Sequence, residues 1–162
     1  MHQFEDKRTD ITITWKKPIT IDQLKFLEKE KCQDTYFYKI VGHCNGNCKL
    51  FYIGKCLNQY LTTRIFQKDH IEKQSRFKLE HKKHTLLVSF GNLDNGDDYK
   101  DSQLTDVESL LIYSHTHEDF AFMKNIQCRL NHKVISNYRI TNKGWRDEGM
   151  YQTVAYGLFV KG

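Results

Sequence analysis

Short stretches rich in aromatic and β-branched residues alternate along this chain with polar stretches. The alternation of apolar and polar residues over positions 11–15 predicts a strand that ends before Pro18. Gln23 follows Thr20 at the spacing of a capping box, so we expect a helix to begin directly after Thr20. The N-terminal part therefore predicts one strand and one scaffold helix.

Two β-rich stretches, at positions 36–41 and 50–53, lie on either side of an Asn-Gly dipeptide. Asn-Gly is a strong turn signal, so the two stretches predict an antiparallel hairpin. The pairing that we expect across this turn places Tyr38 opposite Tyr52. Because directly opposed side chains point to the same face of a sheet, both phenol hydroxyls would line one pocket. The alternative is that the two tyrosines simply pack across the hairpin.

The segment after the hairpin predicts a helix from about 59 to 69, with Asn58 as its N-cap. Arg64 and Lys68 form a stripe on this helix beside an apolar one. The run from 68 to 83 is strongly basic, and on a duplex it would contact phosphates, whereas the alternative is a plain solvated face. The residues that we expect to contact nucleic acid are Lys39, Lys68, Lys73 and Arg76.

The best strand pattern lies further along the chain. Residues 84–90 form a nearly continuous apolar run, which predicts a central strand buried on both faces. A helix is expected from about 102 to 114, and β-like segments follow around Ile140 and from 153 to 160. Helices and strands are therefore both expected in one unit.

Composition adds limits to this picture. A chain of 162 residues predicts a single domain, 1–162. It contains neither an apolar run of about 20 residues nor a signal-peptide core, so we expect a soluble, cytoplasmic protein with no membrane partner. The five cysteines are an odd number, which favours reduced thiols over a disulfide framework. A net charge of +5 with 13% aromatic residues suits a polyanionic partner.

A zinc site is an alternative use of Cys44 and Cys48, which are four positions apart with His43 adjacent. The pair lies in a tight turn between strands and lacks a clear second pair of ligands, so zinc is not the expected reading.

The two stretches of the expected hairpin contain Phe37-Tyr38-Lys39-Ile40 and Tyr52-Ile53-Gly54, the second followed by Lys55. These motifs resemble those of the GIY-YIG nucleases: the former matches the end of the first family motif, and the latter matches the second, with the common lysine after it. The resemblance spans about 35–126, which is the expected nuclease core, with extensions on both sides.

The family also has an arginine on the first helix, a glutamate on a later helix and an asparagine beyond it, which are matched here by Arg64, Glu108 and Asn125. Two positions depart from the pattern. Tyr36 stands where glycine is usual in the first motif. The His or Tyr that often follows the arginine by one helical turn is replaced by Lys68, with His70 as the other candidate for that role.

The resemblance implies a metal-dependent endonuclease that leaves 5′-phosphate and 3′-hydroxyl ends. Tyr38 would be the general base, with Tyr52 supporting the water or phosphate, and Arg64 would bind a phosphoryl oxygen. Glu108 would be the sole carboxylate on one Mg²⁺, for which Mn²⁺ is the expected substitute. Asn125 would orient Glu108 or a metal-bound water.

A tyrosine acts as a base only if its pKa falls, because an ordinary phenol with a pKa near ~10 is under about 1% ionised at neutral pH. Neighbouring positive charge favours the phenolate, and Lys39, Lys55, Arg64 and the metal ion are the groups expected to supply it.

The resemblance also implies the fold, which is α+β with a small, mostly antiparallel three-stranded sheet flanked by helices, an N-terminal helix and a C-terminal β extension. Because the core fills most of the chain, the closest functional comparison is with stand-alone type II restriction-like enzymes of this family. These imply double-stranded DNA as substrate and a homodimer that cuts both strands.

Several alternatives remain open at this point. Thr105 to Glu108 has the spacing of a second capping box, so Glu108 would cap its own helix unless that helix already begins near Ser102. Asn92 and Asn131 are rivals of Asn125. The altered first motif favours a catalytically inactive nucleic-acid-binding domain as the second function, and a protein-interaction module with coincidental motifs is the third.

Overall fold

The structure is a computed structural model that describes residues 8–27, 34–56, 61–94, 96–115, 137–147, 150–156 and 158–161. Its strands are β1 (Thr9–Trp15), β2 (Ile19–Thr20), β3 (Thr35–Cys44), β4 (Asn47–Lys55), β5 (Thr85–Leu93), β6 (Tyr138–Gly144), β7 (Thr153–Ala155) and β8 (Leu158–Val160). Its helices are α1 (Ile21–Lys25), α2 (Leu61–Ile65), α3 (Lys68–Glu80) and α4 (Asp101–His115), with a 3₁₀ turn, η2, at Gly96–Asp98.

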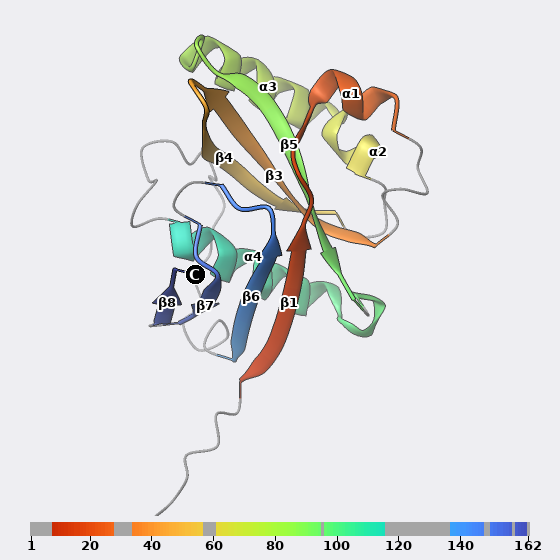
Figure 1. The fold of residues 1–162 in the computed structure, drawn as a ribbon. Helices are drawn as coiled ribbons and strands as arrows, with labels where there is room; N and C mark the ends of the chain where they lie inside the picture. The colour runs from red at the N-terminus through yellow and green to blue at the C-terminus, as the bar shows by residue number, and fades with distance from the viewer. Residues whose placement is uncertain are drawn as a thin grey trace, which may run out of the picture.

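The strands form one mixed, strongly curled sheet in the order β4-β3-β5-β1-β6-β7-β8, with β2 pairing to β5 beside this path (Figure 1). The expectation of a small three-stranded antiparallel sheet is therefore wrong. β1 pairs antiparallel to β5 and parallel to β6, so segments from both ends of the described chain extend the sheet instead of lying outside a core. Backbone groups along the far edge of β5 need partners, and β1 and β2 supply them.

Several locally encoded elements are confirmed. The strand over 11–15 is the end of β1, and the apolar run 84–90 forms most of β5, which has strand neighbours on both sides. The capping box at the start of α1 is present in full: the Thr20 hydroxyl accepts from the Gln23 amide, and the Gln23 side chain accepts from the Thr20 amide. These elements depend on short-range patterns, which is why the sequence predicts them.

Alternating residues of β3 divide the core into two layers. Phe37 and Val41 pack with α4 on one face of the sheet, while Tyr38 and Ile40 pack with α1, α2 and α3 on the other. Phe51 belongs to this second layer. The helices therefore cover opposite faces of the β3–β4 hairpin, and its outer strand β4 lies between them at the end of the strand order (Figure 1).

The hairpin has the predicted Asn-Gly turn, with positive φ at Asn45 and Gly46, but not the predicted register. The turn pairs Cys44 with Asn47, one residue away from the expected register. A bulge between Ile40 and Val41 shifts the pairing by one more, so Tyr38 lies opposite Gly54 and Tyr52 opposite Ile40. Tyr38 and Tyr52 are therefore diagonal neighbours two residues apart. They still share a face because side chains repeat every second residue.

The single helix expected over 59–69 is wrong, because the described chain has α2 ending at Ile65 and α3 beginning at Lys68. Gln67 adopts an extended conformation as the N-cap of α3, which interrupts the helical backbone. The predicted N-cap, Asn58, lies outside the described residues. Because of the break, Lys68 does not follow Arg64 by one turn of a continuous helix, and His70 faces the sheet instead.

Candidate active site

Tyr38 lies at the centre of the candidate site and is fully buried. Its hydroxyl is 2.8 Å from Nε2 of His70, which is also fully buried and comes from α3. The Tyr38 ring covers Gly54 on the neighbouring strand so closely that any Cβ at position 54 would overlap with it. Glycine is thus required at the end of the Tyr-Ile-Gly motif by the packing of Tyr38.

Burial lowers the pKa of His70 to about 4, and the positive charge of Arg64 acts in the same direction. The imidazole is therefore neutral at neutral pH. Burial, followed by the proximity of Tyr52, raises the pKa of Tyr38, so the phenol stays protonated and donates its hydrogen bond to Nε2. The tautomer that accepts at Nε2 carries its proton on Nδ1, which is buried and has no hydrogen-bond partner within the described chain.

The neighbouring residues by themselves therefore do not bring the pKa of Tyr38 below its ordinary value. Arg64 does act in that direction, but the loss of solvent around the phenol outweighs it, and Glu108 adds to the rise. Nε2 of His70 accepts the hydrogen bond of this protonated phenol.

Tyr52 completes a cluster of three rings. Its centroid is 6.0 Å from that of Tyr38 and 5.7 Å from that of His70. On its outer side, the Lys73 ammonium lies 4.7 Å from the centroid of the Tyr52 ring and 3.4 Å from its hydroxyl oxygen. Sequence reasoning assigned Lys73 to general phosphate binding and did not find this contact, although Lys73 follows His70 by one helical turn.

Arg64 reaches the site from the end of α2. Its guanidinium donates to the Gln67 side chain and lies 3.7 Å from the Asp69 carboxylate. Neither partner was predicted, and Asp69, five residues after Arg64, would not be its neighbour on a continuous helix. The positive charge of the guanidinium still reaches two neighbours: it opposes the rise in the pKa of Glu108 and adds to the fall in the pKa of His70.

Glu108 approaches from the opposite side of the hairpin, on α4. Burial raises the pKa of its carboxyl from 4.5 to about 7, against the opposing influence of Lys55 and Arg64. The carboxyl forms no hydrogen bond or ion pair with the part of the chain that the structure describes. The capping-box alternative is excluded, since α4 already begins at Asp101.

Lys55 lies between the hairpin and α4. Its ammonium donates to Asp101 Oδ1 at 2.5 Å and to Thr105 Oγ1 at 2.7 Å. Asp101, Thr105 and Glu108 follow one another along one face of α4, so Lys55 holds this face against the end of β4. Its contribution to the site is to fix α4 and to add positive charge near Glu108.

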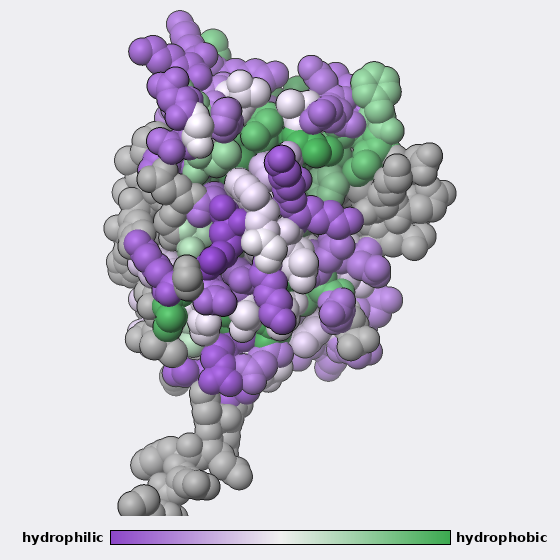
Figure 2. Space-filling model, in the orientation of Figure 1, coloured by the Kyte–Doolittle hydropathy of each residue, from purple (hydrophilic) through white to green (hydrophobic). Residues whose placement is uncertain are grey.

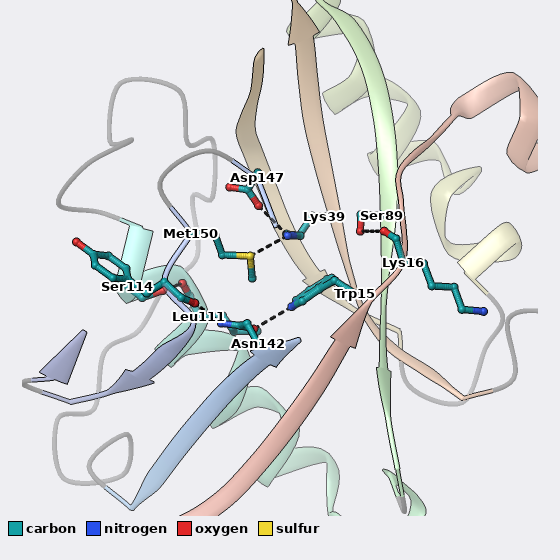
Figure 3. Close-up of polar contacts among 10 residues, drawn as sticks. Trp15, Lys16, Lys39, Ser89, Leu111, Ser114, Asn142, Asp147 and Met150 are labelled. Carbon is teal, nitrogen blue, oxygen red and sulfur yellow. Dashed lines mark hydrogen bonds and ion pairs between the residues drawn. The ribbon is translucent and has the colours of Figure 1, made fainter. Parts of the chain in front are cut away.

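Lys39 was expected to bind nucleic acid and to perturb the tyrosines, but it is fully buried on the other face of β3 (Figure 3). Its ammonium donates to Asp147 Oδ1 at 2.7 Å and to Met150 Sδ at 3.0 Å, and lies 4.3 Å and 5.0 Å from the ring centroids of Trp15 and Trp145. Burial lowers its pKa, whereas Asp147 opposes that change. Lys39 therefore anchors the segment after β6 to the sheet and is not available to a phosphate. Lys68 and Arg76, in contrast, are exposed on α3.

The remaining candidates divide into two groups. Asn125 and its rival Asn131 lie outside the described residues, and Asn92 accepts a hydrogen bond from Thr35 on the neighbouring strand.

The two cysteines of the alternative zinc site point to opposite faces of the hairpin, because Cys48 lies opposite His43 in the strand register and Cys44 lies opposite Asn47. Among the described residues, no cluster of three or more histidines, cysteines or carboxylates gathers to hold a metal ion.

Tyr36, which stands in place of the family glycine, lies in β3 where the pairing with β5 is irregular, between Thr35 and Phe37. Its ring lies directly on Gly96, and its hydroxyl donates to Asp97 at 2.6 Å. Burial and this carboxylate raise the pKa of Tyr36 to about 12. Tyr36 therefore ties β3 to the loop before α4 and does not enter the ring cluster.

Comparisons of the chain with models of protein families, with curated proteins and with solved structures find no match. Among the described helices, none combines the length and the apolar character that crossing a bilayer requires. The chemistry of the site must therefore be argued from its own geometry. It brings a buried Tyr–His hydrogen bond, a guanidinium, an ammonium and an unpaired carboxyl to the end of one hairpin.

Proposed function

We propose that this protein is a divalent-metal-dependent endonuclease that hydrolyses DNA phosphodiesters to 5′-phosphate and 3′-hydroxyl ends, with a site of the GIY-YIG type. The observation that supports this proposal is the convergence of Tyr38, Tyr52, Arg64 and Glu108 from four separate elements on the end of the β3–β4 hairpin. In a protein-interaction module with coincidental motifs these four groups would be scattered, so their convergence argues against that alternative.

Hydrolysis requires removal of a proton from the attacking water and neutralisation of the phosphoryl oxygens. Tyr38 would take the proton from water while its own proton passes to Nε2 of His70. Burial opposes that transfer by lowering the pKa of His70, so the negative charge of the bound phosphate would have to stabilise the imidazolium. Arg64, whose side chain is partly exposed, would bind a phosphoryl oxygen through its planar fork. Lys73 and the Tyr52 hydroxyl would contact a second one.

Glu108 is the residue that would hold Mg²⁺ or Mn²⁺. The fit is with one carboxylate and a metal ion that keeps most of its waters, since the Glu108 carboxyl has no partner in the described chain and ionises more readily beside added positive charge. When bound, the metal ion would supply charge neutralisation at the leaving oxygen.

Incubation of supercoiled plasmid with the purified protein and Mg²⁺ tests this function. We expect nicks that DNA ligase reseals, because resealing requires 5′-phosphate and 3′-hydroxyl ends. Glu108→Gln and Tyr38→Phe should be inactive, whereas the exposed carboxylate variant Glu72→Gln should cleave normally. Equal cleavage, or equal absence of cleavage, by wild type and Glu108→Gln would contradict the proposal.

A nucleic-acid-binding domain without catalysis is the second candidate. Two observations favour it: Tyr38 is completely enclosed, and Arg64 already contacts Gln67 and Asp69. Such a domain would bind DNA in EDTA with steep salt dependence and never nick it. If the enzyme is active, linear product formed without a nicked intermediate would support the restriction-like homodimer, and sedimentation would measure the association directly.

A further inference from the structure

A groove of about 560 Å³ lies beside α3, on the flank away from Lys73. α1 and the start of β5 form its other walls. Figure 2 shows apolar side chains among hydrophilic ones at this end of the molecule, where Figure 1 places α1 and α3. The lining residues used below are Asp22, Lys25, Phe66, Ile71, Lys78 and Leu86.

The groove combines an apolar floor with a cationic rim. Phe66, Ile71 and Leu86 supply the apolar surface, and Ile71 remains 47% exposed. Lys25 and Lys78 supply positive charge, and the Lys25 ammonium lies 5.8 Å from the centroid of the Phe66 ring. The acidic lining residue, Asp22, is 3.5 Å from Lys25 and offsets part of that charge. An aromatic face next to ammonium groups suits a nucleobase and its phosphate.

Phe66 also connects the groove to the candidate site. It follows Arg64 by two residues in the short break between α2 and α3, so the two Cα atoms are at most about 7.6 Å apart. A strand whose phosphate contacts Arg64 would therefore reach Phe66 within one or two nucleotides. A base in a duplex is stacked and paired, so only an unpaired nucleotide would turn into the groove.

We propose that the groove binds an unpaired nucleotide next to the phosphate held by Arg64, so that the preferred substrate is DNA with a single-stranded segment beside the cleavage point. The base lies against Phe66 and Ile71, and its phosphate lies at Lys78. The proposal rests on the nuclease function for the role of Arg64, but the groove itself is tested by binding alone.

The test is fluorescence anisotropy in EDTA with a labelled duplex that carries a single-stranded thymidine tail, compared with the same duplex with blunt ends. Wild type should bind the tailed duplex more tightly. Phe66→Leu should remove that preference, with a loss of about fivefold or more, while Phe66→Tyr keeps it. Lys78→Ala should reduce the slope of log K against log salt by about 0.7, the value for one phosphate contact on a single strand.

Phe26→Leu and Lys143→Ala are matched controls, because both residues are exposed, neither lines the groove, and Lys143 lies on β6 outside the basic run 68–83. Thermal melts establish that each variant folds; if Phe66→Leu does not, Ile71→Asp replaces it, since Ile71 is already half exposed. Equal binding of tailed and blunt duplexes by wild type overturns the proposal, as does equal behaviour of groove and control variants. Displacement of the tailed duplex by polyglutamate with no effect of Phe66→Leu would identify an acidic-peptide groove and also overturn it.

The two proposals fail separately. Tail-dependent binding through Phe66 and Lys78 without any cleavage in Mg²⁺ would leave the groove assignment standing and remove the nuclease. If cleavage depends on Glu108 but the groove variants bind like wild type, the nuclease function stands and the groove assignment falls.

Discussion

Replacement of Glu108 by glutamine should make the protein more stable at alkaline pH while removing its activity. The carboxyl has a pKa of about 7 in the folded state against an ordinary value of 4.5, because burial disfavours its charged form. Between these values the folded protein retains a proton that the unfolded chain has released. The free energy of unfolding of the wild type should therefore fall as pH rises from about 4.5 to about 7 and stay reduced above that.

The size of this effect follows from the two pKa values. At about 1.4 kcal/mol for each tenfold change in the ionisation equilibrium, it amounts to roughly 3 kcal/mol at most. Glutamine has nearly the same shape but does not ionise. The difference in the free energy of unfolding between Glu108→Gln and wild type should thus be near zero at pH 4 and approach its maximum at pH 8. Other titrating groups cancel because they are common to both proteins.

Urea denaturation followed by the fluorescence of Trp15 and Trp145 measures this difference across the pH range. Mg²⁺ in about 100-fold excess over its Kd should restore about 2.7 kcal/mol to the wild type at pH 8 and nothing to Glu108→Gln. Glu72→Gln, on the exposed side of α3, should show neither effect. A Glu108→Gln variant that is less stable than wild type at pH 8, or a difference that does not change with pH, would refute the reasoning.

Three further predictions concern packing around the site. Gly54→Ala should reduce the free energy of unfolding by about 1–3 kcal/mol and abolish cleavage, because the added Cβ overlaps with the Tyr38 ring. Gly46→Ala introduces backbone strain but no close contact, so this variant should cleave normally. Chemical denaturation and plasmid nicking compare the two variants. His70 has a lowered pKa in the folded state, so wild type should lose stability as pH falls from 6.5 towards about 4, and His70→Gln should lose less; equal acid profiles would contradict this. Asp147→Ala should lower the free energy of unfolding by about 3–5 kcal/mol, because it leaves the Lys39 ammonium buried without its carboxylate. The double variant Lys39→Met, Asp147→Leu should have near-normal stability and unchanged DNA affinity. Weaker DNA binding by the double variant would mean that Lys39 does contact nucleic acid.

Patterns of neighbouring residues are enough to predict the local elements of this fold. The capping box at Thr20, the Asn-Gly turn, the buried run of β5 and the extent of α4 all follow from patterns a few residues long. The sequence also singled out the candidate residues, including both His70 and Glu108. It identified them by their kinds and order, which requires no knowledge of register.

How those elements combine depends on contacts that only the three-dimensional structure reveals. Three features were not predicted: the bulge in the hairpin, the break at Gln67 and the pairing of β1 with β6. Each depends on packing or on contacts between segments that are distant in the sequence. The same contacts bury several ionisable side chains and thereby shift their pKa values. Lys39 and Tyr38 are neighbours in the sequence and would both be read as reactive groups, but alternate sides of β3 place one in an ion pair and the other against His70. Desolvation depends on everything that surrounds a group in three dimensions, so the pKa values of Tyr38, His70 and Glu108 have no signature in a linear pattern.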